Sequence, residues 1–230
     1  MIKKIDVLGI KLDNYTVREA IMIVETYLSN NVLNTIENIS MQMLADSEND
    51  SVLKEVLSSV DLGIIGEREI MQAAGVATMQ RIRETEENDF FYEFFKRVER
   101  NKKSVFFLGE TAEAIAKVSE RLQQEYPKLL IAGEYAVENC VGDLEAVIND
   151  MNATTPDVIV SVLPTPLQEH FFAEHRDKMN ANIWYGIGAF DPQKKRRGLG
   201  HLFKSAIRRG RLKSSMDKYE KKNKSAGEAV

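Results

Sequence analysis

The sequence predicts an α/β fold in which a largely parallel, Rossmann-like sheet lies between two layers of helices. The first observation behind this prediction is the second half of the chain, where short apolar runs alternate with longer segments that carry one apolar stripe at helical spacing. The second is that these short runs are continuously apolar, as expected of strands with helices on both faces. The third is size, because 230 residues with 43% hydrophobic content suffice for one such core.

The first half of the chain predicts an opening strand followed by a helix. Thr16 and Glu19 form a capping-box pattern, and apolar residues recur after them at helical spacing as far as Leu28. Beyond that helix, the apolar patterns indicate a strand over 32–38, a short helix over 52–57, a strand over 61–65 and a helix over 90–98.

From residue 104 the alternation of strands and helices is regular. It indicates strands over 105–108, 129–132, 158–162 and 183–186, helices over 111–126 and 144–152, and a further helix that begins near 166. In open parallel sheets, ligands bind at the carboxyl ends of the strands. We therefore expect the functional site in the loops after Ile65, Leu108, Val162 and Gly186.

Charge divides the chain into an α/β domain at 1–191 and a basic appendage at 192–230. The appendage holds 13 Lys and Arg against three acidic residues, whereas the rest of the chain holds 18 against 32. Apolar residues recur within it at helical spacing between basic ones, which is typical of a helix that binds an anionic membrane surface. The residues expected to make that contact are Leu202, Phe203, Arg208, Arg209 and Arg211.

The appendage has two alternative interpretations besides a membrane contact. A solvated, disordered tail explains the same composition. Nucleic acid is a competing polyanion, but Phe203 and Tyr219 are few aromatic residues for base stacking, so we expect no nucleic-acid partner.

Several classes of protein lack support in the sequence. One cysteine, Cys140, leaves no internal disulfide and fits a reducing cytoplasm. The first 14 residues are broken by Lys3, Lys4, Asp6 and Lys11, so we expect neither a secretion signal nor a membrane span there. The three histidines have no metal-ligand spacing, and we find no Walker loop, Gly-x-Ser-x-Gly elbow or dinucleotide fingerprint. We therefore expect no metal and no cofactor.

The clearest site signal is the segment Pro164–Glu169, which follows the strand predicted over 158–162. Its two prolines stiffen the loop, and Pro166 suits the first position of the next helix. Gln168 can donate and accept hydrogen bonds, and a helix N-terminus offers free amides to an anion. An ordinary strand-to-helix loop is the alternative.

A second signal is Gly186-Ile187-Gly188-Ala189-Phe190-Asp191, which also follows an apolar strand. Its glycines would let the backbone approach a ligand closely, and Asp191 could accept a hydrogen bond from a hydroxyl group. A Gly-x-Gly pair alone is weak evidence.

Taken in order, these motifs resemble the WecG/TagA/CpsF glycosyltransferase family over nearly the whole chain. The resemblance begins at Val7-Leu8-Gly9-Ile10, continues through Phe106-Phe107-Leu108-Gly109, and is strongest at Pro164–Glu169 and Gly186–Asp191. It implies an inverting, metal-independent enzyme that moves an N-acetylmannosamine-type sugar from UDP to a polyprenyl-diphosphate-linked sugar for cell-surface polymers. It further implies a peripheral position on the inner face of the bacterial plasma membrane and self-association into a homo-oligomer.

The resemblance also implies which residues bind the nucleotide sugar. Asn38, Gly109, Gln168, Glu169, Gly188 and Asp191 would line the donor pocket, and Arg81 or Arg83 would balance phosphate charge.

The chain departs from the family pattern at three places, all on the chemical side of the site. Ile36-Glu37-Asn38 stands where the family has Thr-x-Asn, Gly66-Glu67 where it has Asp-Gly, and Arg196-Arg197-Gly198 where it has Arg-Ala-Pro. The family aspartate is the proposed base, and a general base is worth about 10²–10⁴-fold in rate.

Three hypotheses follow from these departures. In the first the protein is an active glycosyltransferase with Glu67 as the substitute base. In the second it is a catalytically impaired family member that acts as a nucleotide-sugar-binding or scaffold protein. An unrelated nucleotide-binding α/β protein is the third.

Overall fold

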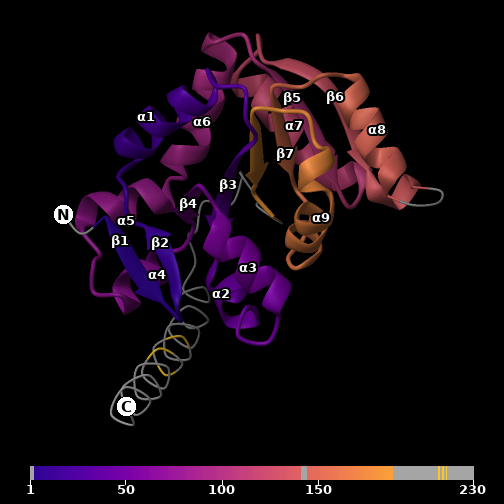
Figure 1. Cartoon of the computed structure of the whole chain (residues 1–230). Helices are drawn as coiled ribbons and strands as arrows, with labels where there is room; N and C mark the ends of the chain where they lie inside the picture. The colour runs from indigo at the N-terminus through magenta and orange to yellow at the C-terminus, as the bar shows by residue number, and fades with distance from the viewer. Residues whose placement is uncertain (1–2, 141–143, 189–211, 213, 215, 217–230) are drawn as a thin grey trace.

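The computed structural model describes residues 3–140, 144–188, 212, 214 and 216, and it confirms the predicted α/β fold (Figure 1). A six-stranded sheet forms its centre, and every neighbouring pair of strands in it is parallel. In spatial order the strands are β4 (Leu62–Ile65), β3 (Asn34–Ile39), β8 (Ile183–Gly186), β7 (Val158–Ser161), β5 (Ser104–Gly109) and β6 (Leu130–Ala136).

One face of the sheet is covered by α1 (Val17–Tyr27), α6 (Asp89–Arg100) and α7 (Ala112–Glu125). The aromatic stripe of α6 supplies much of this layer, because its four phenylalanines are all buried against the sheet. Phe94 and Phe95 meet edge to face at 5.2 Å between ring centroids, and the Phe94 ring lies 4.7 Å from that of Tyr185 in β8. Edge-to-face contact, as between Phe94 and Phe95, is a preferred geometry for aromatic packing in a core.

The other face is covered by α3 (Ser51–Ser59), α8 (Glu145–Ala153) and α9 (Leu167–His175). Trp184 in β8 is fully buried there, and the rings of Phe171 and Phe172 in α9 pack on it. Because side chains alternate along a strand, Trp184 and Tyr185 anchor opposite layers. Short 3₁₀ turns follow β6 at Val137–Asn139 and α9 at Arg176–Lys178.

A third hydrophobic cluster lies beside the sheet and was not predicted from the sequence. The opening strand proves to be an antiparallel hairpin of β1 (Lys4–Val7) and β2 (Ile10–Asp13), separate from the main sheet. Leu8 and Gly9 form its turn with positive φ angles of 56° and 83°, as a tight hairpin requires. The hairpin packs with α2 (Met41–Asp46) and α4 (Arg68–Ala73), and α5 (Met79–Glu86) follows α4.

The basic appendage is represented in the described residues only by Leu212, Ser214 and Met216. All three are helical; Leu212 is buried in the third cluster and Met216 packs against it. The five residues predicted to contact a membrane lie outside the described residues. In the part of the chain that the structure describes, no helix is long and apolar enough to cross a bilayer.

Candidate functional site

Two groups of polar side chains meet β3 from opposite faces near its carboxyl end. Glu37 pairs in register with Gly186 of β8, and Asn38 pairs with Ile64 of β4. Since successive strand residues face opposite sides, Glu37 points to the α9 layer and Asn38 to the α6 layer. The segments 164–169 and 186–188, singled out from the sequence, therefore lie at one edge of the sheet with the ends of β3 and β4.

On the α6 side, a small cavity lies at the ends of β3 and β4, and we call it the Asn38 pocket. Its polar lining is Asn38, Arg81, Glu84, Thr85 and Asn88, and Gly66 and apolar residues complete it. Arg81 is 6% exposed, yet its Nε is buried without a hydrogen-bond partner. A buried guanidinium with an N–H that has no partner can still donate a charge-assisted hydrogen bond to an anion.

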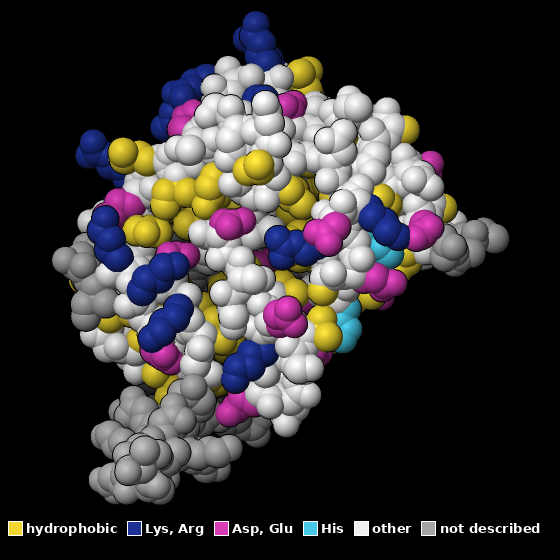
Figure 2. Space-filling model, viewed as in Figure 1, with side chains coloured by type: hydrophobic (Ala, Val, Ile, Leu, Met, Phe, Trp, Pro, Cys, Tyr) yellow, Lys and Arg dark blue, Asp and Glu magenta, His cyan; other side chains and the backbone are white. Residues whose placement is uncertain are grey.

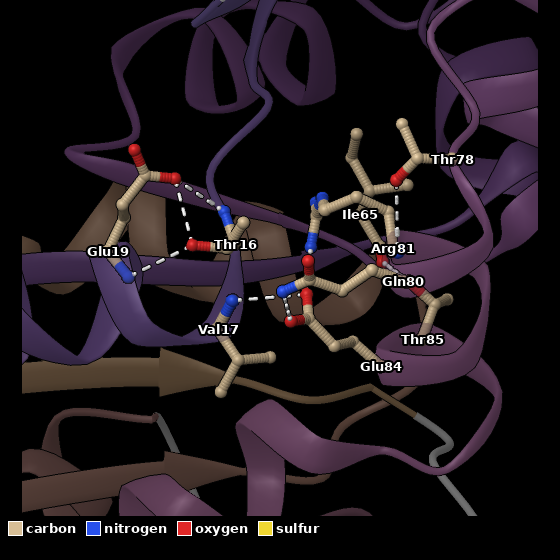
Figure 3. A network of polar contacts seen from close by, with 9 residues as sticks. All are labelled: Thr16, Val17, Glu19, Ile65, Thr78, Gln80, Arg81, Glu84 and Thr85. Atoms are coloured by element: carbon tan, nitrogen blue, oxygen red, sulfur yellow. Dashed lines mark hydrogen bonds and ion pairs between the residues drawn. The ribbon is translucent and has the colours of Figure 1, made fainter. Parts of the chain in front are cut away.

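Arg81 is held in the Asn38 pocket by the first turn of α5 (Figure 3). The Thr78 hydroxyl caps this helix and accepts from the Arg81 backbone N–H at 3.3 Å. The Arg81 Nη1 donates to Glu84 Oε2 at 3.1 Å, and the same oxygen accepts from the backbone N–H of Val17 at 3.2 Å. The Gln80 amide donates to the other Glu84 oxygen at 2.8 Å. Both oxygens of Glu84 are thus engaged as acceptors.

The predicted capping box of α1 is confirmed and lies next to this network in Figure 3. The Glu19 carboxylate accepts from the Thr16 backbone N–H at 2.9 Å, and the Thr16 hydroxyl accepts from the Glu19 backbone N–H at 3.3 Å. The Thr16 hydroxyl also donates to the Glu19 carboxylate at 2.9 Å, and the two hydrogen bonds that this carboxylate accepts lower the pKa of Glu19. The box fixes where α1 begins, and hence the Val17 N–H that reaches Glu84.

A groove of about 680 Å³ runs between α1 and α6 and adjoins the Asn38 pocket, with which it shares Val17 and Glu84. Figure 2 shows hydrophobic, basic and acidic side chains mixed over the region where Figure 1 places these helices. We call it the α1–α6 groove; its lining also includes Arg18, Ile21, Met22, Glu25, Asp89, Tyr92, Glu93 and Arg97. Acidic residues outnumber basic ones in this lining.

On the α9 side, the polar residues form a buried cluster that we call the Glu37 network: Glu37, Thr165, Gln168, Glu169 and Gly188. Gln168 is its centre. The Gln168 Nε2 donates to both Glu37 oxygens, at 3.1 and 3.0 Å, and to Glu169 Oε1 at 3.3 Å. The Gln168 Oε1 accepts from the Gly188 backbone N–H at 3.1 Å, and the Thr165 hydroxyl donates to Glu169 Oε1 at 3.1 Å.

The two carboxyl groups of the Glu37 network favour their protonated forms. Burial raises the pKa of Glu37 well above its usual value, and the nearby Glu169 carboxyl adds to the effect. Burial likewise raises the pKa of Glu169. Like charges this close in a medium of low polarity disfavour double ionisation, so the pair retains a proton to higher pH than isolated carboxyls do.

The two glycines of the Gly-x-Gly motif serve different physical needs. A Cβ on Gly186 would lie 1.9 Å from Glu37 Oε2, so only glycine leaves room for the Glu37 carboxyl over β8. Gly188 has a φ of +61°, in the left-handed region that favours glycine. The motif therefore makes space for a buried side chain and a turn.

The structure also locates the other residues predicted from the sequence. Glu67 is the N-cap of α4, makes no capping hydrogen bond with its side chain, and is not part of the Asn38 pocket lining. Arg83 is exposed on α5, unlike Arg81. A Cβ on Gly109 would lie 2.6 Å from Ile115 and 2.7 Å from Val162, so this glycine serves close packing. Asp191 lies outside the described residues.

Sequence reasoning missed two residues of the site. Glu84 gave no signal, because an acidic residue on a charged helix is ordinary. Glu37 appeared only as part of a departure from the family pattern, although a charged residue inside an apolar strand is unusual. Among the described residues, no group of three His, Cys, Asp or Glu side chains is arranged to bind a metal ion.

Comparison with known proteins gives a consistent assignment. Residues 5–191 match the family described as "Glycosyl transferase WecG/TagA/CpsF family". Over 104 residues the chain is 33% identical to the N-acetylglucosaminyldiphosphoundecaprenol N-acetyl-beta-D-mannosaminyltransferase of Bacillus spizizenii, a match that covers 45% of this chain and 40% of that relative. Over 187 residues it is 22% identical to the protein of that name from Staphylococcus aureus, covering 80% and 73% respectively. This chain belongs to the WecG/TagA/CpsF glycosyltransferase family.

Proposed function

We propose that this protein binds a UDP-activated N-acetylated amino sugar and transfers the sugar, with inversion and without a metal ion, to a lipid-linked sugar diphosphate. The relatives' names support a mannosamine-type sugar and an undecaprenyl-diphosphate acceptor. The observation that carries the proposal is Arg81, buried at the ends of β3 and β4 with its Nε unpartnered beside Asn38. In this role its free N–H would bind the diphosphate of the donor and stabilise the charge of the departing UDP.

The base for the acceptor hydroxyl is the open part of this mechanism, and we propose Glu67. It follows Gly66 at the end of β4, and its side chain makes no capping hydrogen bond. Glu84 lines the Asn38 pocket but accepts from Val17, Gln80 and Arg81. These contacts engage both oxygens of Glu84 and hold its carboxylate against α5 and the start of α1. Glu67 is therefore the better candidate of the two.

The direct test is transfer from UDP-N-acetylmannosamine to a short-chain lipid-diphosphate-N-acetylglucosamine analogue, followed as UDP release and product mass. Turnover in the wild type and a loss of about 100-fold in kcat in Glu67→Gln are expected if Glu67 is the base. The matched variant is Glu84→Gln, which keeps the shape of the other carboxylate. If Glu67→Gln retains full turnover, the assignment of Glu67 as the base is wrong.

The second candidate is a catalytically impaired family member that still binds the nucleotide sugar. The geometry of Gly66 favours it, since a Cβ there would lie 2.8 Å from Asn38 Oδ1 and 3.1 Å from the Ile39 carbonyl oxygen. An aspartate at this position therefore requires Asn38 to move. Measurable UDP binding without turnover, and turnover gained by Gly66→Asp, would identify this candidate.

For the acceptor, we propose the α1–α6 groove, because it adjoins the Asn38 pocket and combines apolar side chains with carboxylates. Carboxylates accept hydrogen bonds from sugar hydroxyls, and apolar side chains receive the less polar parts of an amphipathic ligand. The net acidic lining suits the neutral sugar of the acceptor better than its diphosphate.

We propose that the basic appendage brings the protein to the inner face of the plasma membrane. Truncation before Pro192 is a poor test, because it also removes Leu212, which is buried in the third cluster. Replacing Arg208, Arg209 and Arg211 together by alanine leaves Leu212 in place. We expect this variant to lose sedimentation with vesicles that contain anionic lipid, at about 1 kcal/mol for each charge removed. Unchanged sedimentation would remove the membrane proposal.

A further inference from the structure

Glu37 is a buried carboxyl side chain in the central sheet. It is 1% exposed in β3, and both of its oxygens accept from the amide of Gln168. A buried carboxyl is costly even when it is hydrogen-bonded, and it is protonated more readily for that reason. If Glu37 only filled space in the core, an apolar residue at this position would stabilise the fold more.

The contacts of Gln168 show what depends on Glu37. The side chain of Gln168 is 1% exposed, so its orientation is set by its partners in the protein. Its Nε2 faces the two carboxyl groups, which forces its Oε1 toward the backbone N–H of Gly188, 3.1 Å away. If the amide turned over, its Nε2 would face the Gly188 N–H, and two donors would point at each other.

The segment that receives this contact is the turn after β8. The Ile187 N–H donates to the Ser161 carbonyl at 2.9 Å, and Gly188, with its positive φ, donates to Gln168. Gly186 provides the space through which the Glu37 carboxyl reaches Gln168 across β8. The Glu37 carboxyl therefore depends on two other positions: Gly186 leaves space for it, and Gln168 donates hydrogen bonds to it.

We propose that Glu37 is a positioning residue which, through Gln168, holds the Gly186–Gly188 turn in the conformation that the donor nucleotide requires. The part of this inference that concerns the nucleotide rests on the proposed function. The part that concerns the turn does not, because it follows from the contacts of the Glu37 network alone. Gln168 then acts indirectly: both ends of its amide are engaged by the protein, and the turn faces the ligand.

The test compares Glu37→Leu, which removes the acceptor, with Glu37→Gln, which keeps an acceptor oxygen for the Gln168 amide. The first measurement is hydrogen exchange of the Gly188 backbone N–H in the ligand-free protein. We expect Glu37→Leu to lower protection about tenfold, as loss of one hydrogen bond would, and Glu37→Gln to stay within about threefold of the wild type. Equal protection in the two variants would overturn the proposal.

The second measurement is the Kd of UDP by calorimetry with the same proteins. We expect Kd to rise about tenfold in Glu37→Leu and to be restored by the amide in Glu37→Gln. If the wild type does not bind UDP, the proposed function fails, while the exchange of Gly188 still decides whether Glu37 holds the turn. If protection falls in Glu37→Leu and Kd does not change, the turn is held but the donor does not depend on it, and the proposal is wrong.

A measurement on the wild type keeps the inference testable if Glu37→Leu does not fold. The side-chain amide protons of Gln168 are expected to exchange slowly in nuclear magnetic resonance spectra, because both lie against buried carboxyl groups. The side-chain amide of Gln42, on an exposed helix surface with Asp46 as its partner, is the internal comparison. Exchange of Gln168 as fast as that of Gln42 would overturn the proposed contact.

Discussion

The two sides of β3 carry consecutive polar residues in opposite situations. In the Asn38 pocket, the buried cation Arg81 has one hydrogen-bond donor without a partner, and the α1–α6 groove lies next to it. In the Glu37 network, the central amide of Gln168 has partners at both ends and almost no exposure. The comparison teaches that one side is suited to receive an anion, whereas the other is suited to keep a turn in shape.

The largest expected effect is on stability, and it concerns the Glu37 network. Gly186→Ala would place a Cβ 1.9 Å from Glu37 Oε2 and force the carboxyl out of its site. We expect a loss of about 3 kcal/mol in the free energy of unfolding, the upper end for overpacking, measured by urea denaturation. The control is Gly63→Ala in β4, where the nearest atom to the new Cβ would be 3.6 Å away.

A double variant sharpens this prediction. In Gly186→Ala/Glu37→Ala the clashing carboxyl is absent, so the two substitutions should be strongly non-additive, and the double variant should recover much of the lost stability. Additive losses would mean that Gly186 is required for a reason other than the passage of Glu37.

The next largest expected effect is on UDP binding, and it concerns the Asn38 pocket. Arg81→Ala should weaken UDP binding by about 10- to 100-fold, the range for removing a charge-assisted hydrogen bond to phosphate. Arg83→Ala is the matched control, because Arg83 is two residues away on the same helix and exposed. Calorimetry with UDP and with uridine separates the phosphate from the base: the loss should appear with UDP alone. An equal loss with uridine would place Arg81 away from the diphosphate.

A smaller effect is expected in the pH dependence of stability, and it again separates the two sides. The pKa of Glu37 is raised in the folded protein by burial and by Glu169 of α9, and Tyr185 of β8 lies close enough to be affected by Glu37 in turn. A carboxyl with a raised pKa stabilises the fold at low pH, and that contribution is lost as the pH rises through the raised pKa. The wild type should therefore lose stability over that range.

Glu37→Gln removes this titration, so its unfolding free energy should fall less steeply as pH increases. Asn38→Ala, on the other side of β3, is the control: its side chain carries no titratable group, so the slope should stay as in the wild type. The measurement is a series of urea denaturation curves from pH 5 to about pH 9. An identical slope for wild type and Glu37→Gln would mean that Glu37 does not titrate in this range.

The sequence predicts the central sheet well because its strands and long helices repeat with clear periods. The aromatic stripe of α6 and the apolar runs of β5 and β7 predict these elements from the residues of each segment alone. The β1–β2 hairpin and the helices α2, α4 and α5 were missed, because four to eight residues carry too little periodicity. The hairpin, α2 and α4 gain their stability from the third cluster. Tertiary packing, not local pattern, decides such elements.

The site was predictable in position but not in chemistry. Gln168 and Gly188 were placed at the correct edge by the rule for parallel sheets, and the structure brings them into contact. That Gln168 is turned inward depends on Glu37, which is 131 residues away in the sequence. A charged residue inside an apolar strand is unusual, but nothing in the sequence around Glu37 indicates which distant side chain it contacts.

The smallest expected effect is on acceptor binding, and it concerns the α1–α6 groove. Met22 is 66% exposed and lines the α1–α6 groove. Met22→Asp removes apolar surface and adds a charge to a lining that is already acidic, so the KM for the lipid-linked acceptor should rise about threefold while kcat is unchanged. Met79→Asp is the control, since Met79 is 84% exposed and lies outside the groove lining. If both variants raise KM alike, the added charge acts at long range, and the groove is not the acceptor site.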